Sequence, residues 1–161
     1  MHSQGAASSS TRIDTGTPGR RRVLFVCTGN ATRSQMAEAW LRRYGGEQFE
    51  VQSAGIEPRE AVDALAVAAM AECGVDMAEQ HPKDVWHFVD QPWDFVITTC
   101  DRANETCPRF PGPHEPIHWR FQDPATAQGS QEERLRIYRR VRDEILTRVR
   151  LFVGVHTRAR I

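Results

Sequence analysis

The first regular pattern along the chain is a run of apolar residues that ends at a cysteine. Residues 21–27 contain the segment VLFV, which is rich in β-branched and aromatic side chains and is followed by turn-forming residues. Because the run is short and bounded by a turn, it predicts a buried strand that ends at Cys27. Residues 34–44 then carry apolar side chains at helical spacing and stop at Gly45, so we expect a helix there.

The same two patterns alternate along the rest of the chain. Apolar or alternating runs predict three further strands, at residues 48–54, 93–99 and 115–119. Helical patterns predict three further helices, at residues 61–73, 82–90 and 131–152. Strands that alternate with helices indicate an α/β domain with a parallel sheet covered by helices, over residues 21–153. Ligands of such sheets bind at the carboxyl ends of the strands, where both Cys27 and Cys100 are expected.

The two ends of the chain carry no such pattern. Residues 1–20 are rich in Ser, Gly and Thr and lack a hydrophobic segment, so we expect a disordered extension and not a secretory signal. Residues 154–161 are expected to form a frayed tail. No apolar run approaches the ~20 residues of a membrane span, and we expect one cytoplasmic domain without a membrane partner.

Charge and cysteine content narrow the function. The chain has 21 basic and 21 acidic residues, a balance that does not favour nucleic acid as a partner. Lys83 is its only lysine, and we draw no function from that. Without a signal peptide a framework of structural disulfides is not expected, so catalytic, redox or metal roles for the cysteines gain weight. Cys73 follows an Ala-rich helical segment and is predicted to be a buried core cysteine.

The segment CTGNATRS, from Cys27 to Ser34, carries the strongest chemical signal. A strand, a short loop with glycine and a helix start form a cradle of N–H groups, to which the helix N-terminus adds positive partial charge. Arg33 can donate two hydrogen bonds to a tetrahedral oxyanion. The same field favours a thiolate, to which Thr28 or Ser34 could donate. The alternative is a core cysteine with a solvated arginine, but the placement favours a nucleophile on the floor of an anion site.

At these residues the chain resembles the low-molecular-weight tyrosine phosphatase superfamily. VCTGNATRSQMAE is similar to its signature, above all in the thioredoxin-coupled arsenate reductase branch, whose usual form is CTGNSCRSQMAE. SAGI, at residues 53–56, matches the next block, and the likeness covers roughly residues 22–150. The resemblance implies a three-layer α/β/α fold with a central four-stranded parallel sheet. It also implies a substrate-binding loop made of Thr28, Gly29, Asn30, Ala31, Thr32, Arg33 and Ser34.

Two loop residues depart from the usual form of that signature, namely Ala31 and Thr32. The family often has a second cysteine where Thr32 stands, but that cysteine is not part of the family's redox relay. Its absence should therefore remove a side reaction and leave the activity.

Cys100 and Cys107 lie seven positions apart in the segment CDRANETCP. On a rigid helix this separation is about 10 Å, whereas a disulfide needs Cα atoms within roughly 7 Å. The pair can therefore bond only if the segment is not helical or unwinds. The alternatives are two unrelated cysteines, a static disulfide, or metal ligands together with His114 or His118. The resemblance favours a redox relay, because simple phosphatases of this fold generally lack the pair.

Asp123 lies before Pro124, which biases it toward an extended conformation. From the residues alone this is either an exposed, positioned carboxylate or an ordinary Asp-Pro turn. In the superfamily the Asp-Pro pair is the general acid motif. The resemblance therefore implies that Asp123 donates the proton to the leaving group.

The resemblance also raises the question of a bound alkali cation. In some family members such a cation, for example potassium, lies behind the loop. The matching positions here are Asn30, Glu38, Ser53 and, after a gap, Asp84, which Lys83 precedes. These four residues are the candidate metal ligands, and no organic cofactor is expected.

Three functions follow from these residues. In the first, arsenate is reduced to arsenite by a relay through Cys27, Cys100 and Cys107, with thioredoxin or a low-molecular-weight thiol as the reductant. In the second, the chain is a tyrosine phosphatase that uses Cys27, Arg33 and Asp123. In the third, the cradle only senses an oxyanion. The cysteine pair favours the reductase.

Overall fold

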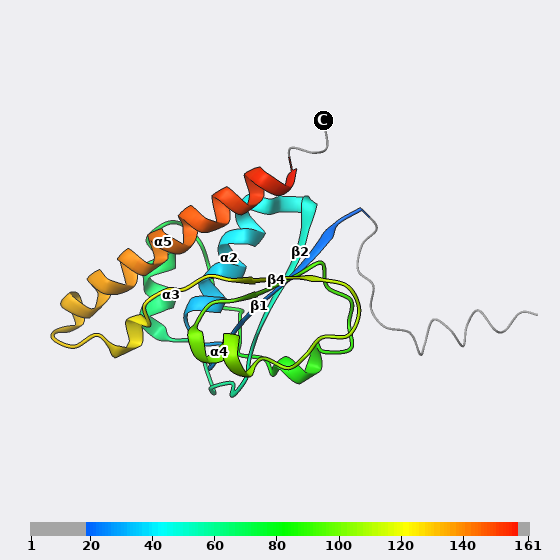
Figure 1. Cartoon of the computed structure of the whole chain (residues 1–161). Helices are drawn as coiled ribbons and strands as arrows, with labels where there is room; N and C mark the ends of the chain where they lie inside the picture. Colours follow the sequence, from blue (N-terminus) through cyan, green and yellow to red (C-terminus); the bar gives the residue numbers. More distant parts are fainter. Residues whose placement is uncertain (1–18, 158–161) are drawn as a thin grey trace, which may run out of the picture.

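A four-stranded parallel sheet forms the centre of the structure. The computed structural model describes residues 19–157, and Figure 1 shows the sheet with its surrounding helices. The strands are β1 (Arg21–Cys27), β2 (Phe49–Gly55), β3 (Phe95–Thr98) and β4 (Glu115–His118). Their order is β2-β1-β3-β4, and all pairings are parallel. This confirms the predicted sheet and, with the helices below, the predicted three-layer α/β/α fold.

Within the described residues, four α-helices and three 3₁₀ turns connect the strands. The helices are α2 (Arg33–Gly45), α3 (Ala64–Ala71), α4 (Asp101–Thr106) and α5 (Gln131–Thr157). The turns are η1 (Gly46–Gln48), η2 (Val85–His87) and η3 (Pro124–Thr126). The helix predicted at residues 82–90 is thus a single 3₁₀ turn, because Phe88 N–H bonds back to the Val85 carbonyl and closes it. The sequence did not decide whether the segment between Cys100 and Cys107 is helical, and in the structure it forms α4.

β1 pairs with β2 along one edge and with β3 along the other, and side chains pack on both of its faces. Val23 and Phe25 belong to a core that α2, α3 and α5 complete. Leu24 and Val26 belong to a second core on the other face, with residues of α4 and η2. All four side chains are fully buried. Burial on both faces explains why this segment is continuously apolar and does not alternate.

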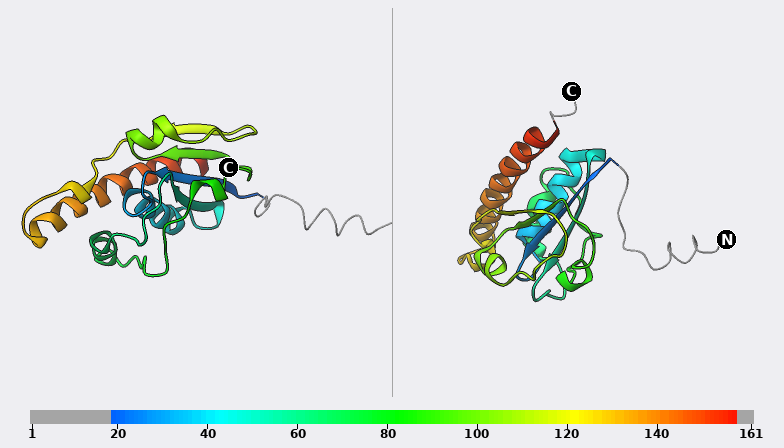
Figure 2. Two further views of the ribbon diagram at one scale, coloured as in Figure 1. Left: turned by 90° about the horizontal axis from the view of Figure 1, so that it is seen from below. Right: turned by 45° about the vertical axis from the view of Figure 1, so that its right-hand side comes forward.

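α5 is the long amphipathic helix predicted from the sequence. It lies beside α2 and α3 and runs without interruption in every view (Figures 1 and 2). Its buried side chains follow helical spacing and are Tyr138, Val141, Ile145, Val149 and Phe152. The helix carries many charges, and no helix within residues 19–157 is both long and apolar enough to cross a membrane.

The carboxyl end of α5 corrects one prediction. The helix continues to Thr157, so the tail predicted to fray from residue 154 is helical over residues 154–157. The reason is tertiary: the His156 ring packs against those of Phe95 and Phe152, with centroids 4.6 and 4.4 Å apart. Residues 158–161 lie outside the described part of the chain.

The amino end is described only from Gly19. Residues 1–18 of the predicted disordered extension, 1–20, lie outside the described residues. Arg20 is ordered by contact with the sheet, because its guanidinium donates to the Phe49 carbonyl at 2.6 Å.

Cys73 corrects a second prediction, because it is exposed and not part of the core. α3 ends at Ala71, and the Cys73 N–H donates to the Met70 carbonyl in a tight turn that leads to Gly74, with φ +76°. Once the helix ends, its periodicity no longer directs the side chain inward. The apolar pattern therefore overstated the length of the helix.

Gly55, at the end of β2, allows the loop after β1 to approach the sheet. A Cβ at this position would lie 2.8 Å from the Thr28 carbonyl oxygen and 2.9 Å from Asn30 Cβ. Such separations are well below van der Waals contact, so the loop fits only against a glycine. The SAGI block therefore serves the packing of the loop.

We predict opposite effects of alanine at two glycines. Gly55→Ala should lower the free energy of unfolding by about 1–3 kcal/mol, because the methyl group overpacks the loop. Gly154→Ala should raise it by about 0.5–1 kcal/mol, because Gly154 is helical and a Cβ added there would meet nothing within 4 Å. Urea denaturation measures both changes. A Gly55→Ala protein as stable as the wild type would contradict the packing argument.

Candidate active site

Cys27 is the last residue of β1, and the loop that follows folds around its sulfur. The Asn30 N–H points at Cys27 Sγ at 3.3 Å, which requires Asn30 to adopt the left-handed conformation, with φ +51°. Asparagine tolerates this region better than most residues. α2 then begins at Arg33, and the side chain of Thr32 does not cap it. The N–H groups at this helix end are therefore available to an anion.

A chain of hydrogen bonds behind the loop leaves the Ser34 hydroxyl hydrogen free to donate to Cys27. The Glu38 carboxylate only accepts, so Ser53 Oγ donates to it and accepts from Asn30 Nδ2 at 2.9 Å. The second hydrogen of Asn30 Nδ2 goes to Ser34 Oγ at 2.8 Å. The hydroxyl hydrogen of Ser34 is then left for Cys27 Sγ, 2.9 Å away. Donation in this direction would hold the sulfur of Cys27 in place for attack.

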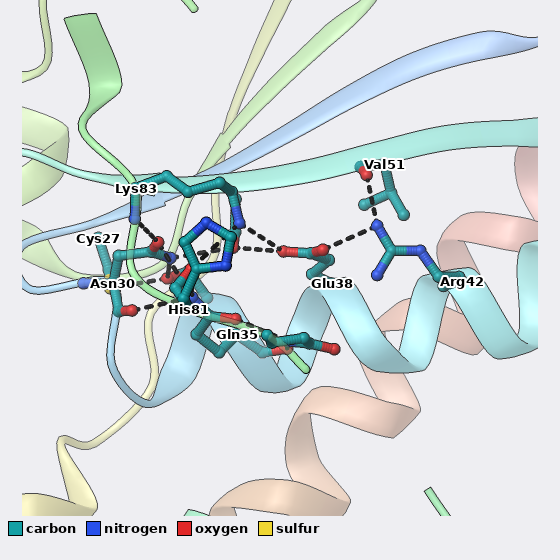
Figure 3. Close-up of polar contacts among 11 residues, drawn as sticks. Cys27, Asn30, Gln35, Glu38, Arg42, Val51, His81 and Lys83 are labelled. Atoms are coloured by element: carbon teal, nitrogen blue, oxygen red, sulfur yellow. Dashed lines mark hydrogen bonds and ion pairs between the residues drawn. The ribbon is translucent and has the colours of Figure 1, made fainter. Parts of the chain in front are cut away.

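The side-chain amide of Asn30 is held from both ends. Its Oδ1 accepts from the backbone N–H of Lys83 at 2.8 Å and from Gln35 Nε2 at 3.0 Å. Because its oxygen faces two donors, the amide cannot turn over without leaving buried donors unpaired. Figure 3 shows Asn30 between Cys27 and these partners.

Arg33 and Asp123 face each other at the mouth of the loop. Arg33 Nη2 lies 3.6 Å from Asp123 Oδ2, and Arg33 Nη1 donates to the Phe121 carbonyl at 3.2 Å. Asp123 has the extended backbone predicted before Pro124, and its Oδ1 accepts from the Ala125 N–H at 3.0 Å. The Nε of Arg33 is buried without a partner among the described residues. A bound oxyanion would satisfy this donor.

A cavity of about 340 Å³ opens at Cys27. Five of the predicted loop residues line it, namely Thr28, Gly29, Ala31, Thr32 and Arg33, and Asp123 is on its wall. Asn30 and Ser34 are fully buried behind the loop, so they hold the thiol and do not face the cavity.

The rim of the cavity adds residues that the sequence did not single out: Glu57, Arg59 and Arg102. Arg59 is bonded to the loop through its backbone, because its backbone N–H donates to the Gly29 carbonyl at 3.0 Å. Arg102 pairs with Glu57 at 3.0 Å. The one available signal for Glu57 and Arg59 was their position directly after SAGI.

The second predicted thiol, Cys100, lies beside the loop. It directly precedes α4 at the N-cap position, without a capping hydrogen bond from its side chain. It is buried, and its Sγ is 3.4 Å from Thr28 Oγ1. Cys107 lies at the other end of α4. Burial raises the pKa of the Cys107 thiol to about 11. Neither thiol is in a disulfide, so the structure shows a reduced state in which a helix separates the pair.

Exposed ion pairs hold α4 in place. Asp101 accepts from His118 Nε2 at 3.0 Å and from Arg120 Nε at 3.2 Å, and the hydrogen bond from His118 is the main cause of its lowered pKa. Ala103 is the only buried residue of the six in α4. Exposed ion pairs contribute ~0–1 kcal/mol each, so little energy opposes unwinding of this helix.

The candidate cation ligands already have hydrogen-bond partners within the protein. Asn30, Ser53 and Glu38 form the chain described above, but the Asp84 carboxylate accepts from the Trp86 N–H and caps η2. Within residues 19–157 no three His, Cys, Asp or Glu side chains form a metal site, which leaves the zinc alternative for the cysteine pair without support. An alkali ion at these residues would meet the ammonium group of Lys83, which lies 3.4 Å from Glu38 Oε1.

The direction of donation at Ser34 leads to a prediction. In Ser34→Ala the thiolate loses its hydroxyl donor, and alkylation of Cys27 by iodoacetamide at pH 7 should slow about tenfold. Peptide mass spectrometry measures the rate at Cys27. Thr147→Ala is the control, since that hydroxyl lies on the exposed face of α5 and donates to the Asp143 carbonyl. An unchanged rate in Ser34→Ala would exclude Ser34 as the donor.

Comparison with known proteins agrees with this geometry. Residues 22–159 match the family described as low molecular weight phosphotyrosine protein phosphatase. An arsenate reductase of Halalkalibacterium halodurans is 44% identical over 133 residues, which are 83% of this chain and 95% of the relative. The crystal structure of an arsenate reductase from Archaeoglobus fulgidus has 32% identity and a TM-score of 0.66, and covers 82% of this chain and 98% of that chain.

A thioredoxin-dependent arsenate reductase of Corynebacterium glutamicum has 27% identity and a TM-score of 0.66. The aligned region covers 93% of this chain and 65% of the C. glutamicum chain. The chain therefore belongs to the low molecular weight phosphotyrosine protein phosphatase family, together with these arsenate reductases.

Proposed function

We propose that the protein reduces arsenate to arsenite by a relay through Cys27, Cys100 and Cys107. The observation that carries the proposal is the second buried thiol at the anion loop, with Cys100 Sγ 3.4 Å from Thr28 Oγ1. A hydrolase of this fold needs only a water molecule beside the anion loop and has no use for a second thiol there. The relatives named as arsenate reductases support the same choice.

Arsenate is a tetrahedral oxyanion, and the cavity offers donors at the positions that such an anion needs. Five of the loop residues from Thr28 to Arg33 line the cavity, and the side chain of Thr32 does not cap the N–H groups of the first turn of α2. Arg33 adds its guanidinium, including the partnerless Nε. Phosphate has the same shape and charge, so the loop selects a class of anion and does not itself determine the reaction.

In the first step the Cys27 thiolate attacks arsenic, and one oxygen of arsenate leaves as water. Asp123 supplies the proton for that oxygen, since its Oδ2 lies 3.6 Å from the guanidinium that binds the anion. The donors from Ser34 and Asn30 hold the attacking sulfur in place. A covalent bond between Cys27 sulfur and arsenic results.

In the second step the Cys100 thiolate attacks the sulfur of Cys27. The sulfur–arsenic bond breaks, and its electron pair stays on arsenic, which leaves as arsenite. Two thiols are thereby oxidised to the Cys27–Cys100 disulfide, and arsenic gains two electrons. If water attacked first, arsenate would be released unchanged.

In the third step Cys107 attacks Cys100 and frees Cys27. The helix between them must unwind for this bond to form, because two helical turns separate the thiols by about 10 Å. Unwinding also exposes Cys107 to water, which removes the burial that disfavours its thiolate. The resulting Cys100–Cys107 disulfide is the substrate for the reductant, for which we propose thioredoxin, as in the relative from C. glutamicum.

Phosphatase activity is the second candidate. The family match and the three residues Cys27, Arg33 and Asp123 support a phosphatase as well as they support a reductase. It leaves Cys100 and Cys107 without a role. Turnover with arsenate distinguishes the two functions.

We expect arsenate-dependent oxidation of NADPH in the presence of thioredoxin and thioredoxin reductase. Cys107→Ser should lose steady-state turnover by more than about 100-fold but still release one arsenite per chain, since Cys100 can complete one cycle. Cys73→Ser is the matched control, because Cys73 is exposed and outside the site.

Two results would contradict the relay. One is full turnover in Cys107→Ser. The other is wild-type hydrolysis of a phosphotyrosine analogue that the loss of Cys100 leaves unchanged, together with no reaction with arsenate.

A further prediction concerns the pH dependence of the helical form of α4. Partial burial raises the pKa of the Cys107 thiol to about 11. The helical form is therefore stabilised fully below about pH 9 and progressively less as the pH approaches 11. At pH 8 iodoacetamide should modify Cys107 at least about tenfold more slowly than the exposed Cys73 in the same protein. Asp101→Asn, which weakens the anchors of α4, should reduce this difference. Equal rates at the two thiols in the wild type would contradict the buried state.

A further inference from the structure

The ammonium group of Lys83 lies behind the loop, beside a buried carboxylate. Its Nζ is 3.4 Å from Glu38 Oε1 and 3.4 Å from the His81 carbonyl oxygen (Figure 3). Side-chain exposure is 17% for Lys83 and 4% for Glu38. A carboxylate with so little contact with water needs a cation beside it.

The two oxygens of Glu38 have different cationic partners. Oε2 pairs with Arg42 at 2.7 Å, and half of the Arg42 side chain is exposed. Oε1 accepts from Ser53, and this is the oxygen that Lys83 approaches. Lys83 therefore neutralises the end of the carboxylate from which the hydrogen-bond chain to Cys27 starts.

Lys83 contacts this chain at a second point. Its backbone N–H donates to Asn30 Oδ1 at 2.8 Å, and its carbonyl accepts from the Gly55 N–H at 2.8 Å. One residue thus contacts the chain at two points, the amide of Asn30 and the carboxylate of Glu38. A charge held in this way is present in every molecule and does not depend on the concentration of an ion.

The residue type suits this place. Among 21 basic residues Lys83 is the only lysine, and all the others are arginine. Lysine carries a compact point charge, whereas arginine carries a wide planar fork. A compact charge near one carboxylate oxygen and one carbonyl oxygen resembles a small monovalent cation in its ligand shell.

We propose that Lys83 is a built-in cation that replaces an alkali ion behind the loop, and that it acts as a positioning residue for the Cys27 thiolate. Its ammonium group holds Glu38 as the acceptor for Ser53, and its backbone N–H holds Asn30 Oδ1. Together these contacts hold the amide of Asn30, whose second hydrogen goes to Ser34 beside the sulfur. The reactivity of Cys27 is therefore independent of potassium. This inference rests on the proposed role of Cys27 as the attacking thiolate, but its test does not need arsenate turnover.

The test compares the alkylation rate of Cys27 at pH 7 in potassium chloride and in choline chloride of equal ionic strength. The wild type should react at the same rate in both salts. Lys83→Met keeps the backbone contacts but loses the charge, so it should react about tenfold more slowly in choline chloride. Potassium chloride should restore part of that loss, because the ion can bind where the ammonium lay. Lys83→Arg, which keeps the charge, should stay within about threefold of the wild type.

Arg43→Met is the matched control for the loss of one positive charge. Arg43 lies on the same helix as Glu38 but donates to the Gly74 carbonyl at 3.1 Å, and its substitution should leave the rate of Cys27 unchanged. Thermal unfolding checks that each variant is folded. The wild type alone already tests the proposal, since a rate more than about threefold higher in potassium chloride would overturn it. A folded Lys83→Met protein that reacts like the wild type, or whose loss is equal in both salts, would also overturn it.

Discussion

The site depends on one buried amide, the side chain of Asn30. Its backbone takes a left-handed conformation that turns the N–H toward Cys27, and its side chain joins the loop to β2 and α2 through Ser53 and Ser34. Because both hydrogens of the amide are used and its oxygen faces two donors, only one orientation satisfies every partner. The loop is thereby fixed before any anion binds, which is the condition for effective electrostatic stabilisation.

The fold followed from the sequence wherever burial imposes a pattern. β1 is a continuous apolar run because the two hydrophobic clusters bury both of its faces. α5 shows helical spacing because only one stripe of its side chains is buried. The pattern was less reliable where tertiary contacts decide. The ring of His156 extends α5 beyond Val153, and the turn after Ala71 directs Cys73 outward. Neither feature produces a periodic pattern of apolar residues in the sequence.

The candidate site shows the same division. The loop from Cys27 to Arg33 is contiguous, so its chemistry could be read directly, and the resemblance supplied the roles of Cys100, Cys107 and Asp123. Arg59 and Arg102 reach the cavity from separate segments. The only sequence signal for Arg59 was its position shortly after SAGI, and Arg102 had none. The cation ligands were the weakest inference, because the sequence shows which oxygens are present but not that Asp84 caps a turn and a lysine lies at Glu38.

The loop binds a tetrahedral anion, and the thiol beside it decides the outcome, because attack on the adduct by Cys100 reduces arsenic whereas attack by water does not. A single turnover tests this claim most directly. The fully reduced protein is mixed with one equivalent of arsenate without a reductant, quenched with acid and mapped by peptide mass spectrometry. The account predicts one arsenite per chain and a disulfide between Cys100 and Cys107, with Cys27 and Cys73 free. Arsenate left unreduced with all four thiols intact would contradict it.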